Sequence, residues 1–207
     1  EIVFTHGATE AINVLAKSLC KTMAPGDAVL LTEMEHHSNL IPWQLAAAER
    51  HLELRFIPFT DAGELDYEAM QELWDDRIKL VSVTHISNVF GTRNDVERII
   101  EFAHNRGVPV MIDGAQAAGH IPVDVSALDC DYYVFSGHKM CGPTGIGVLY
   151  GKEEHLQRLE PCMGGGELIT SVWLDRAVWN EPPYKFEAGT PNIAGAIGLG
   201  AAVQYLQ

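Results

Sequence analysis

The chain has 207 residues, which is enough for one well-buried α/β domain, because single domains usually hold about 100 to 200 residues. Its 28 Asp and Glu residues outnumber 14 Lys and Arg residues, and the net charge of -14 repels the phosphates that dominate nucleic-acid binding. The composition therefore argues against a nucleic acid or an anionic membrane surface as a partner.

Short β-branched runs alternate with helix-period segments through the first 150 residues, a pattern typical of a mostly parallel sheet covered on both faces. Apolar residues recur at helical spacing from Ile12 to Leu19, from Met70 to Trp74 and from Val96 to Ala103. Asp66 is a candidate N-cap of the second of these helices, and Gly107 closes the third. We expect one sheet with strands at Ile2 to Phe4, Ala28 to Thr32, Leu54 to Pro58, Leu80 to Thr84, Val108 to Ile112, Tyr132 to Phe135 and Gly147 to Tyr150.

After Tyr150 the strict alternation stops. The Gly and Pro content of Pro161 to Gly166 and of Glu181 to Tyr184 predicts loops, and Ala194 to Gln207 predicts another helix. The longest mostly apolar tract, Ile193 to Val203, is shorter than the roughly 20 apolar residues that cross a bilayer.

The four cysteines lie far apart, with no C-x-x-C pair and no secretory leader. We therefore expect a soluble protein of a reducing compartment, the cytoplasm. The chain begins at Glu1 without a methionine and stops within a predicted helix at Gln207. We expect residues 1–207 to form one domain that is truncated at both ends.

Polar segments with catalytic potential follow four of the predicted strands. His6-Gly7-Ala8-Thr9 follows the first strand, Asn88 lies beyond the fourth, Asp113-Gly114-Ala115-Gln116 follows the fifth, and Ser136-Gly137-His138-Lys139 follows the sixth. Ligands of an open α/β sheet bind at the carboxyl ends of its strands. We expect these segments to converge on one crevice.

The residue types in this crevice suit an aromatic phosphate-bearing cofactor. The turn-rich residues after Lys139 predict a loop from which its amine can reach a cofactor carbonyl, and Asp113 can hold a pyridine nitrogen protonated. The helix opened by Gly7 to Thr9 favours a phosphate, to which Ser136 and His138 can add donors. Taken singly, each residue also fits a surface charge, a helix cap or a turn former. Their joint placement favours the functional interpretation.

The run Glu33-Met34-Glu35-His36-His37 leaves three interpretations open. His and carboxylate are usual zinc ligands, so the run could bind a metal, although adjacent histidines rarely face one ion together. It could instead be purely structural, or a histidine could form an aromatic lid over a planar cofactor.

With these segments, the sequence resembles the fold-type I pyridoxal-phosphate (PLP) enzymes, and specifically the cysteine desulfurase and selenocysteine lyase group of class V aminotransferases. The resemblance covers essentially the whole chain and implies a three-layer α/β/α fold with a mostly parallel seven-stranded sheet, the large domain of this fold type. Its most specific runs are Thr5 to Asn13, Glu35 to Trp43, Ser87 to Gly91, Asp113 to Gln116, Ser136 to Lys139, Met163 to Gly166 and Phe186 to Asn192.

The resemblance implies roles around the cofactor ring. Lys139 would form a Schiff base with PLP and later move the α-proton of the substrate. Asp113 would pair with the pyridine nitrogen, and His36 would stack on the ring. Gln116 would hydrogen-bond the ring oxygen, and Asn88 would lie beside that oxygen and the substrate carboxylate.

The same resemblance implies that Thr9, Ser136 and His138 hold the phosphate. Thr190 resembles the residue that reaches the phosphate of a neighbouring subunit, so a homodimer is implied too. The paired histidines and the tryptophan of His36 to Trp43 are most similar to the branch that supplies sulfur for iron-sulfur cluster assembly.

The implied activity is a cysteine desulfurase, which converts L-cysteine to L-alanine and passes the sulfur to an enzyme cysteine as a persulfide, and then to a sulfur-acceptor protein. The family's persulfide cysteine and its carboxylate-binding arginine lie beyond Gln207, so we expect this fragment alone to be inactive. Cys141 matches no nucleophile position, and we expect a packed small side chain there. A selenocysteine lyase, a kynureninase-like hydrolase, another class V aminotransferase and a catalytically silent cofactor-binding module remain as alternatives.

Overall fold

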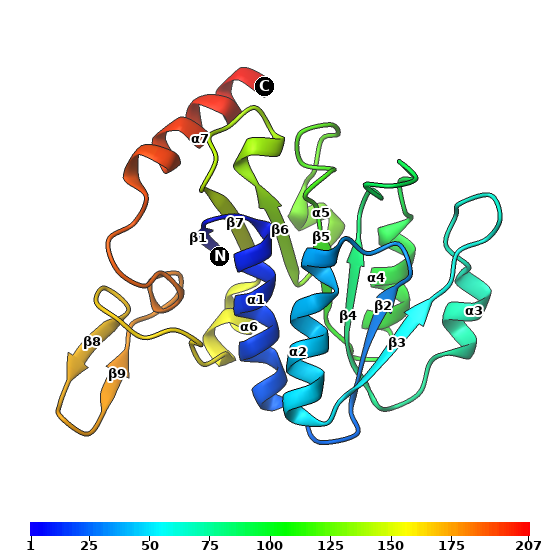
Figure 1. Cartoon of the computed structure of the whole chain (residues 1–207), viewed down its shortest axis with the longest axis horizontal. Helices are drawn as coiled ribbons and strands as arrows, with labels where there is room; N and C mark the ends of the chain where they lie inside the picture. The colour runs from blue at the N-terminus through cyan, green and yellow to red at the C-terminus, as the bar shows by residue number, and fades with distance from the viewer.

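A seven-stranded sheet forms the middle layer of the computed structural model, which describes residues 1–207 (Figure 1). The strands lie in the spatial order β1-β7-β6-β5-β4-β2-β3. Only β7 runs antiparallel to its neighbours β1 and β6, and all other pairs are parallel. The predicted mostly parallel sheet is confirmed, and its strands are β1 (Ile2–Thr5), β2 (Ala28–Thr32), β3 (Glu53–Ile57), β4 (Ile78–Thr84), β5 (Val110–Asp113), β6 (Tyr132–Ser136) and β7 (Gly147–Gly151).

Helices cover both faces of the sheet because successive strand residues point to opposite sides. Val29 and Leu31 pack in the core that contains α1 and α2, whereas Leu30 packs in the core that contains α3 and α4. Strands that are buried on both faces favour continuous apolar runs, which is why β2 reads Ala-Val-Leu-Leu-Thr. The first face carries α1 (Ala8–Leu19), α2 (Ile41–Arg50) and α6 (Glu153–Arg158), and the second carries α3 (Tyr67–Glu72), α4 (Val96–His104) and α5 (Val125–Leu128).

The predicted N-cap of α3 and the predicted end of α4 are both confirmed. The carboxylate of Asp66 accepts hydrogen bonds from the backbone N–H groups of Glu68 and Ala69 at the start of α3. Gly107 adopts φ +70° just beyond α4, the left-handed conformation that favours glycine after a helix. The chain also forms four short 3-10 helices: η1 (Cys20–Thr22), η2 (His37–Asn39), η3 (Gly137–Lys139) and η4 (Tyr184–Phe186).

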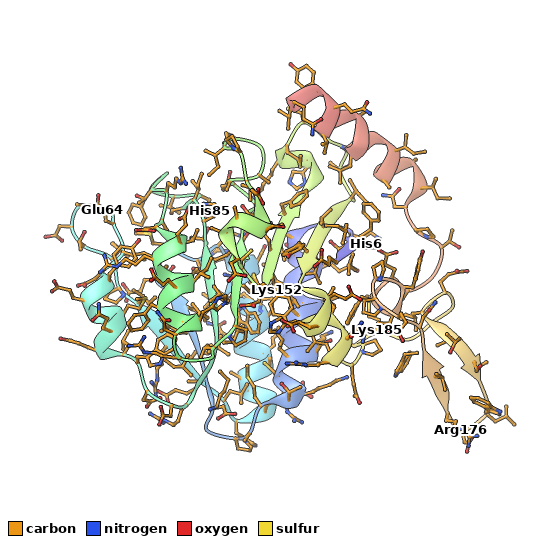
Figure 2. The ribbon with its side chains drawn as sticks, turned by 180° about the vertical axis from the view of Figure 1, so that it is seen from behind. His6, Glu64, His85, Lys152, Arg176 and Lys185 are labelled. Carbon is orange, nitrogen blue, oxygen red and sulfur yellow. The ribbon has the colours of Figure 1, made fainter.

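A hairpin that the sequence did not predict projects away from the sheet (Figure 1). Its strands β8 (Ile169–Val172) and β9 (Ala177–Trp179) pair antiparallel, with Trp173 and Leu174 exposed at the turn. Figure 2 shows Arg176 at the tip of this hairpin and Lys152 in the body of the molecule. The hairpin lies between the two segments that were predicted as loops.

The last helix, α7 (Ile193–Leu206), confirms the predicted C-terminal helix and lies along the opposite edge of the molecule from the β2–β3 edge (Figure 1). Asn192 caps it by accepting a hydrogen bond from the Gly195 N–H, and donates one to the Gly145 carbonyl. The apolar side chains of α7 include the exposed residues Ile193 and Ile197. None of the helices combines the length and the apolar character that crossing a membrane requires.

Two glycines allow the close approaches that shape the carboxyl ends of the strands. A Cβ on Gly147 would lie 2.4 Å from the Cα of Gly7, so only glycine lets the start of α1 lie against β7. A Cβ on Gly114 would lie 2.0 Å from the Tyr133 ring, so that ring packs directly under the residue that follows Asp113. Both contacts fix backbone beside the candidate site.

Candidate functional site

The carboxyl ends of β4, β5 and β6 open onto a cavity of about 220 Å³. Thr84, Asp113 and Ser136, the last residues of these strands, all line it. The predicted convergence at the strand ends is confirmed. The predicted side chains that line the cavity are Thr9, His36, Asn88, Asp113, Gln116, Ser136, His138 and Lys139.

One end of the cavity is built for an anion. The Ala8 N–H, the first of α1, donates to Ser136 Oγ at 2.8 Å, so the Ser136 hydroxyl proton is free to point into the cavity. The N–H groups of Thr9 and Glu10 have no acceptor within the protein, as expected for the first turn of a helix. His138 is exposed at the same end. Free N–H groups and the helix dipole together favour a phosphate.

Asp113 places a buried carboxylate at the floor of the cavity, with 3% of the residue exposed. Its Oδ1 accepts a hydrogen bond of 2.9 Å from the Ala115 N–H, and its Oδ2 has no donor within the protein. Burial raises the pKa of Asp113, while the Ala115 N–H and the Lys139 ammonium oppose the rise. A cationic N–H donor, such as a protonated pyridine, fits the free oxygen because it supplies both a hydrogen bond and the missing countercharge.

His36 lines the cavity, and its neighbour His37 does not. The Ser38 N–H donates to His36 Nδ1 at 3.1 Å, so the neutral ring carries its proton on Nε2. Ser38 Oγ lies 3.0 Å from the same nitrogen and 2.8 Å from Thr9 Oγ1. These contacts fix the orientation of the ring. Nowhere in the chain do three or more His, Cys, Asp or Glu side chains come together to hold a metal ion.

Lys139 ends the 3-10 helix η3, directly after β6. The turn is fixed from both sides, since the Gly137 N–H donates to the Ile146 carbonyl and Met140 is buried. The half-exposed Lys139 side chain lines the cavity and makes no hydrogen bond or ion pair within the protein. Its amine is therefore available to a ligand.

Cys141 corrects one expectation. The sequence predicted a packed small side chain, but Cys141 is exposed. It adopts φ +62° in the turn after Lys139, where the Gly142 N–H donates back to the Gly137 carbonyl. This left-handed turn directs the thiol to solvent instead of into the core.

Asn88 and Gln116 lie at the mouth of the cavity, and neither side-chain amide makes a hydrogen bond within the protein. The buried Ser87 holds the loop of Asn88, because its Oγ accepts from the N–H groups of Val89 and Phe90. Both amides are thus free to bind a ligand, and the loop that carries Asn88 is fixed.

Thr190 is the one predicted site residue that does not line this cavity. It is exposed and lines a second cavity, of about 260 Å³, together with His6, Glu10 and Asn192 (His6 is labelled in Figure 2). Its implied contact with a neighbouring subunit stays a prediction.

Ser38, Thr84 and Ile86 line the cavity without having been predicted. Ser38 is the most informative omission because it links the ring of His36 to Thr9. Two signals could have found these residues. Ser38 lies within the same run as His36, and Thr84 ends a predicted strand.

Known proteins share the fold of this chain and much of its sequence. The family model for aminotransferase class V matches residues 1–207. A cysteine desulfurase of Dickeya dadantii is 53% identical over all of this chain and 50% of its own length, and one of Shigella sonnei is 50% identical, covering 51% of its own length. The chain thus spans about half the length of the curated relatives it matches.

Solved structures agree with this assignment. The cysteine desulfurase CsdA of Escherichia coli superposes with a TM-score of 0.96 at 44% identity, over 99% of this chain and 52% of that one. The apo cysteine desulfurase of Thermococcus onnurineus NA1 gives a TM-score of 0.95 at 44% identity, over 100% and 52%. A Lys-to-Ala mutant of the lyase C-DES with glycine covalently linked to its PLP cofactor gives 0.88 at 30% identity, over 99% and 55%. The chain belongs to the class V aminotransferase family.

Proposed function

We propose that the chain is the pyridoxal-phosphate-binding half of a cysteine desulfurase. The observation that carries the proposal is the convergence of a free lysine amine, a buried carboxylate with one free oxygen and a helix N-terminus on one cavity. The names of the relatives at 50% identity and above support cysteine as the substrate.

The cavity residues fit the parts of the cofactor separately. The Lys139 amine would bind its carbonyl carbon, and Asp113 Oδ2 would accept the hydrogen bond of its ring nitrogen. Gln116 would donate to the ring oxygen, and His36 would cover one face of the ring. The phosphate would bind at the start of α1, with Thr9, Ser136 and His138 as additional donors.

When bound, PLP withdraws electrons from the α-carbon of an attached amino acid and so acidifies its C–H bond. Asp113 would sustain this effect by keeping the ring nitrogen protonated. The Lys139 amine, which lines the cavity, would take and return the α-proton of the substrate as a general base and acid. Asn88, at the mouth of the cavity, would bind the substrate carboxylate and orient the α-carbon.

The overall reaction transfers one sulfur atom: L-cysteine and an enzyme thiol give L-alanine and an enzyme persulfide. The C–S bond breaks, an S–S bond forms, and the thiol proton ends on alanine. We propose that the accepting thiolate and an arginine that clamps the substrate carboxylate come from the region that the relatives have in addition to this half. A sulfur-acceptor protein, in the branch that serves iron-sulfur cluster assembly, would then remove the persulfide sulfur.

We further propose a homodimer in which Thr190 reaches the phosphate held by the other subunit. The exposure of Thr190 and its place outside the cavity of its own subunit support this arrangement. The four unpaired cysteines support a reducing compartment, the cytoplasm.

The test incubates the purified protein with PLP and L-cysteine in D2O. We expect deuterium at the α-carbon of cysteine, lost in Lys139→Ala, and no catalytic formation of alanine by this chain. Exchange with selenocysteine only would favour a lyase of that substrate, and keto-acid formation would favour an aminotransferase. Cofactor binding without exchange of any amino acid would indicate a silent module and overturn the proposal. Alanine turnover that Cys141→Ser abolishes would make Cys141 the sulfur acceptor.

A further inference from the structure

Glu35 directly precedes His36, and the proposed chemistry gives it no role. Its partly buried carboxylate accepts three hydrogen bonds. Oε1 accepts from Thr32 Oγ1 at 2.6 Å and from the Thr84 N–H at 2.9 Å, and Oε2 accepts from Asn39 Nδ2 at 2.6 Å. Because Thr32 ends β2 and Thr84 ends β4, this carboxylate ties the segment between β2 and α2 to two strands of the sheet (Figure 1).

Asn39 completes the network on the core side and is fully buried. Its Oδ1 accepts from Trp43 Nε1 at 2.9 Å and from Ser82 Oγ at 2.7 Å. The indole N–H can only donate, so the amide of Asn39 cannot flip without facing one donor with another. Its NH2 group must therefore face Glu35, and Oε2 of Glu35 must be an acceptor.

His36 lies between Glu35 and Asn39, whose hydrogen bonds fix the backbone on both sides of it. Glu35 fixes the backbone before it, and the Asn39 N–H donates to the His36 carbonyl at 2.7 Å after it. Ser38 holds the ring itself from the other side. The position of the backbone and the orientation of the ring are thus set by separate contacts.

We infer that Glu35, acting with Asn39, is a positioning residue that holds His36 over the bound cofactor. The inference rests on the proposed cofactor site and adds a specific pair of residues to it. If the network only stabilised the fold, breaking it would lower folding stability but would not change how the His36 ring stacks on the ring of the cofactor.

The network keeps its geometry in either charge state of Glu35. Burial raises the pKa of Glu35 to about 8, against hydrogen bonds from Thr32, Asn39 and Thr84. A proton on Oε1 can be accepted by Thr32 Oγ1, whereas Oε2 accepts from Asn39 whether the group is ionised or not. An amide cannot do the same. In Glu35→Gln the side-chain amide can adopt two orientations, and each places its NH2 group opposite another donor. In one orientation the NH2 group faces the NH2 group of Asn39, and in the other it faces the Thr84 N–H.

The double variant Glu35→Gln/Asn39→Asp reverses one hydrogen bond and keeps the net charge. Gln at 35 then donates to Asp at 39, whose other oxygen still accepts from Trp43 and Ser82. This swap is the matched control for Glu35→Gln, because it restores every hydrogen bond of the network.

The experiment measures the PLP dissociation constant by visible absorbance and the circular dichroism of the bound cofactor. We expect Glu35→Gln to raise the dissociation constant by roughly 3- to 10-fold, the range that loss of an aromatic stacking contact gives, and to weaken the dichroic band. The swap should return both values to within about twofold of the wild type. In a His36→Ala background, Glu35→Gln should have no further effect, since it acts through that ring.

Failure of rescue by the swap, or an equal effect of Glu35→Gln with and without His36, would overturn the inference. So would a loss of folding stability with unchanged cofactor affinity and dichroism. A separate readout needs no cofactor: in the apo protein, the backbone amide 15N shift of His36 should change in Glu35→Gln and return to the wild-type value in the swap, whereas the ring tautomer, which the Ser38 N–H sets, should stay Nε2–H in all three proteins. If wild-type protein binds no PLP, the proposed function fails while this NMR result still tests the positioning.

Discussion

Asp113→Asn should have opposite effects on stability and on cofactor binding. Burial raises the pKa of Asp113, so the ionised carboxylate costs folding free energy at neutral pH. This cost begins to fall when the pH drops below the raised pKa and is gone below the ordinary pKa of an aspartate. Asparagine is nearly isosteric and can still accept the Ala115 N–H at Oδ1. The cofactor-free variant should therefore unfold at a higher temperature than the wild type.

The same change should weaken PLP binding because an amide NH2 group replaces Oδ2, the oxygen that would accept from the pyridinium. A hydrogen bond to a charged partner contributes about 1.5–3 kcal/mol, which corresponds to roughly 10- to 150-fold in the dissociation constant. Absorbance titration gives the affinity, and thermal unfolding followed by circular dichroism gives the stability. Asp66→Asn, which changes a capping carboxylate on α3, is the control and should change neither value greatly. Lower apo stability together with unchanged affinity would refute the reasoning.

Two further predictions concern the scaffold. Gly114→Ala should destabilise the fold by about 3 kcal/mol, because its Cβ would lie 2.0 Å from the Tyr133 ring, whereas Gly164→Ala, with no atom within 4 Å, should be nearly neutral in urea unfolding. Equal unfolding midpoints for the two variants would contradict this. For Asp131, burial opposes ionisation, but hydrogen bonds from two histidines hold its pKa well below its usual range. The lowered pKa makes its stabilisation present above about pH 5 and progressively lost as the pH falls below about 4. Asp131→Asn should thus cost about 2 kcal/mol in urea unfolding at pH 7, and this cost should shrink steadily as the pH falls below about 4 toward the lowered pKa of the folded state. A pH-independent difference would rule this out.

The sheet and the cavity were predictable because their signals are local. Each strand is a short run that contains β-branched, aromatic or other apolar residues, and the side chains that matter lie at or just after strand ends, as Asp113 and Ser136 do. Once a parallel sheet is inferred, these residues must share one edge. Asp66 shows the same locality, since a cap needs only its own helix.

Other features depend on contacts that one sequence does not reveal. Glu35 meets Thr84 across 49 residues, and Asn39 meets Ser82 across 43, so neither pair leaves a periodic trace. The β8–β9 hairpin is largely exposed and lacks the regular burial that produces alternation. The exposure of Cys141 follows from a left-handed turn at a non-glycine residue, which residue type alone does not predict.

Mapping the lysine that binds the cofactor tests the central claim most directly. The purified protein is loaded with PLP, reduced with borohydride, digested and analysed by mass spectrometry. We predict one modified peptide, with the pyridoxyl group on Lys139, and its loss together with the visible absorbance in Lys139→Ala. Stoichiometric modification of another lysine, or trapping that persists in Lys139→Ala, would contradict the proposed site.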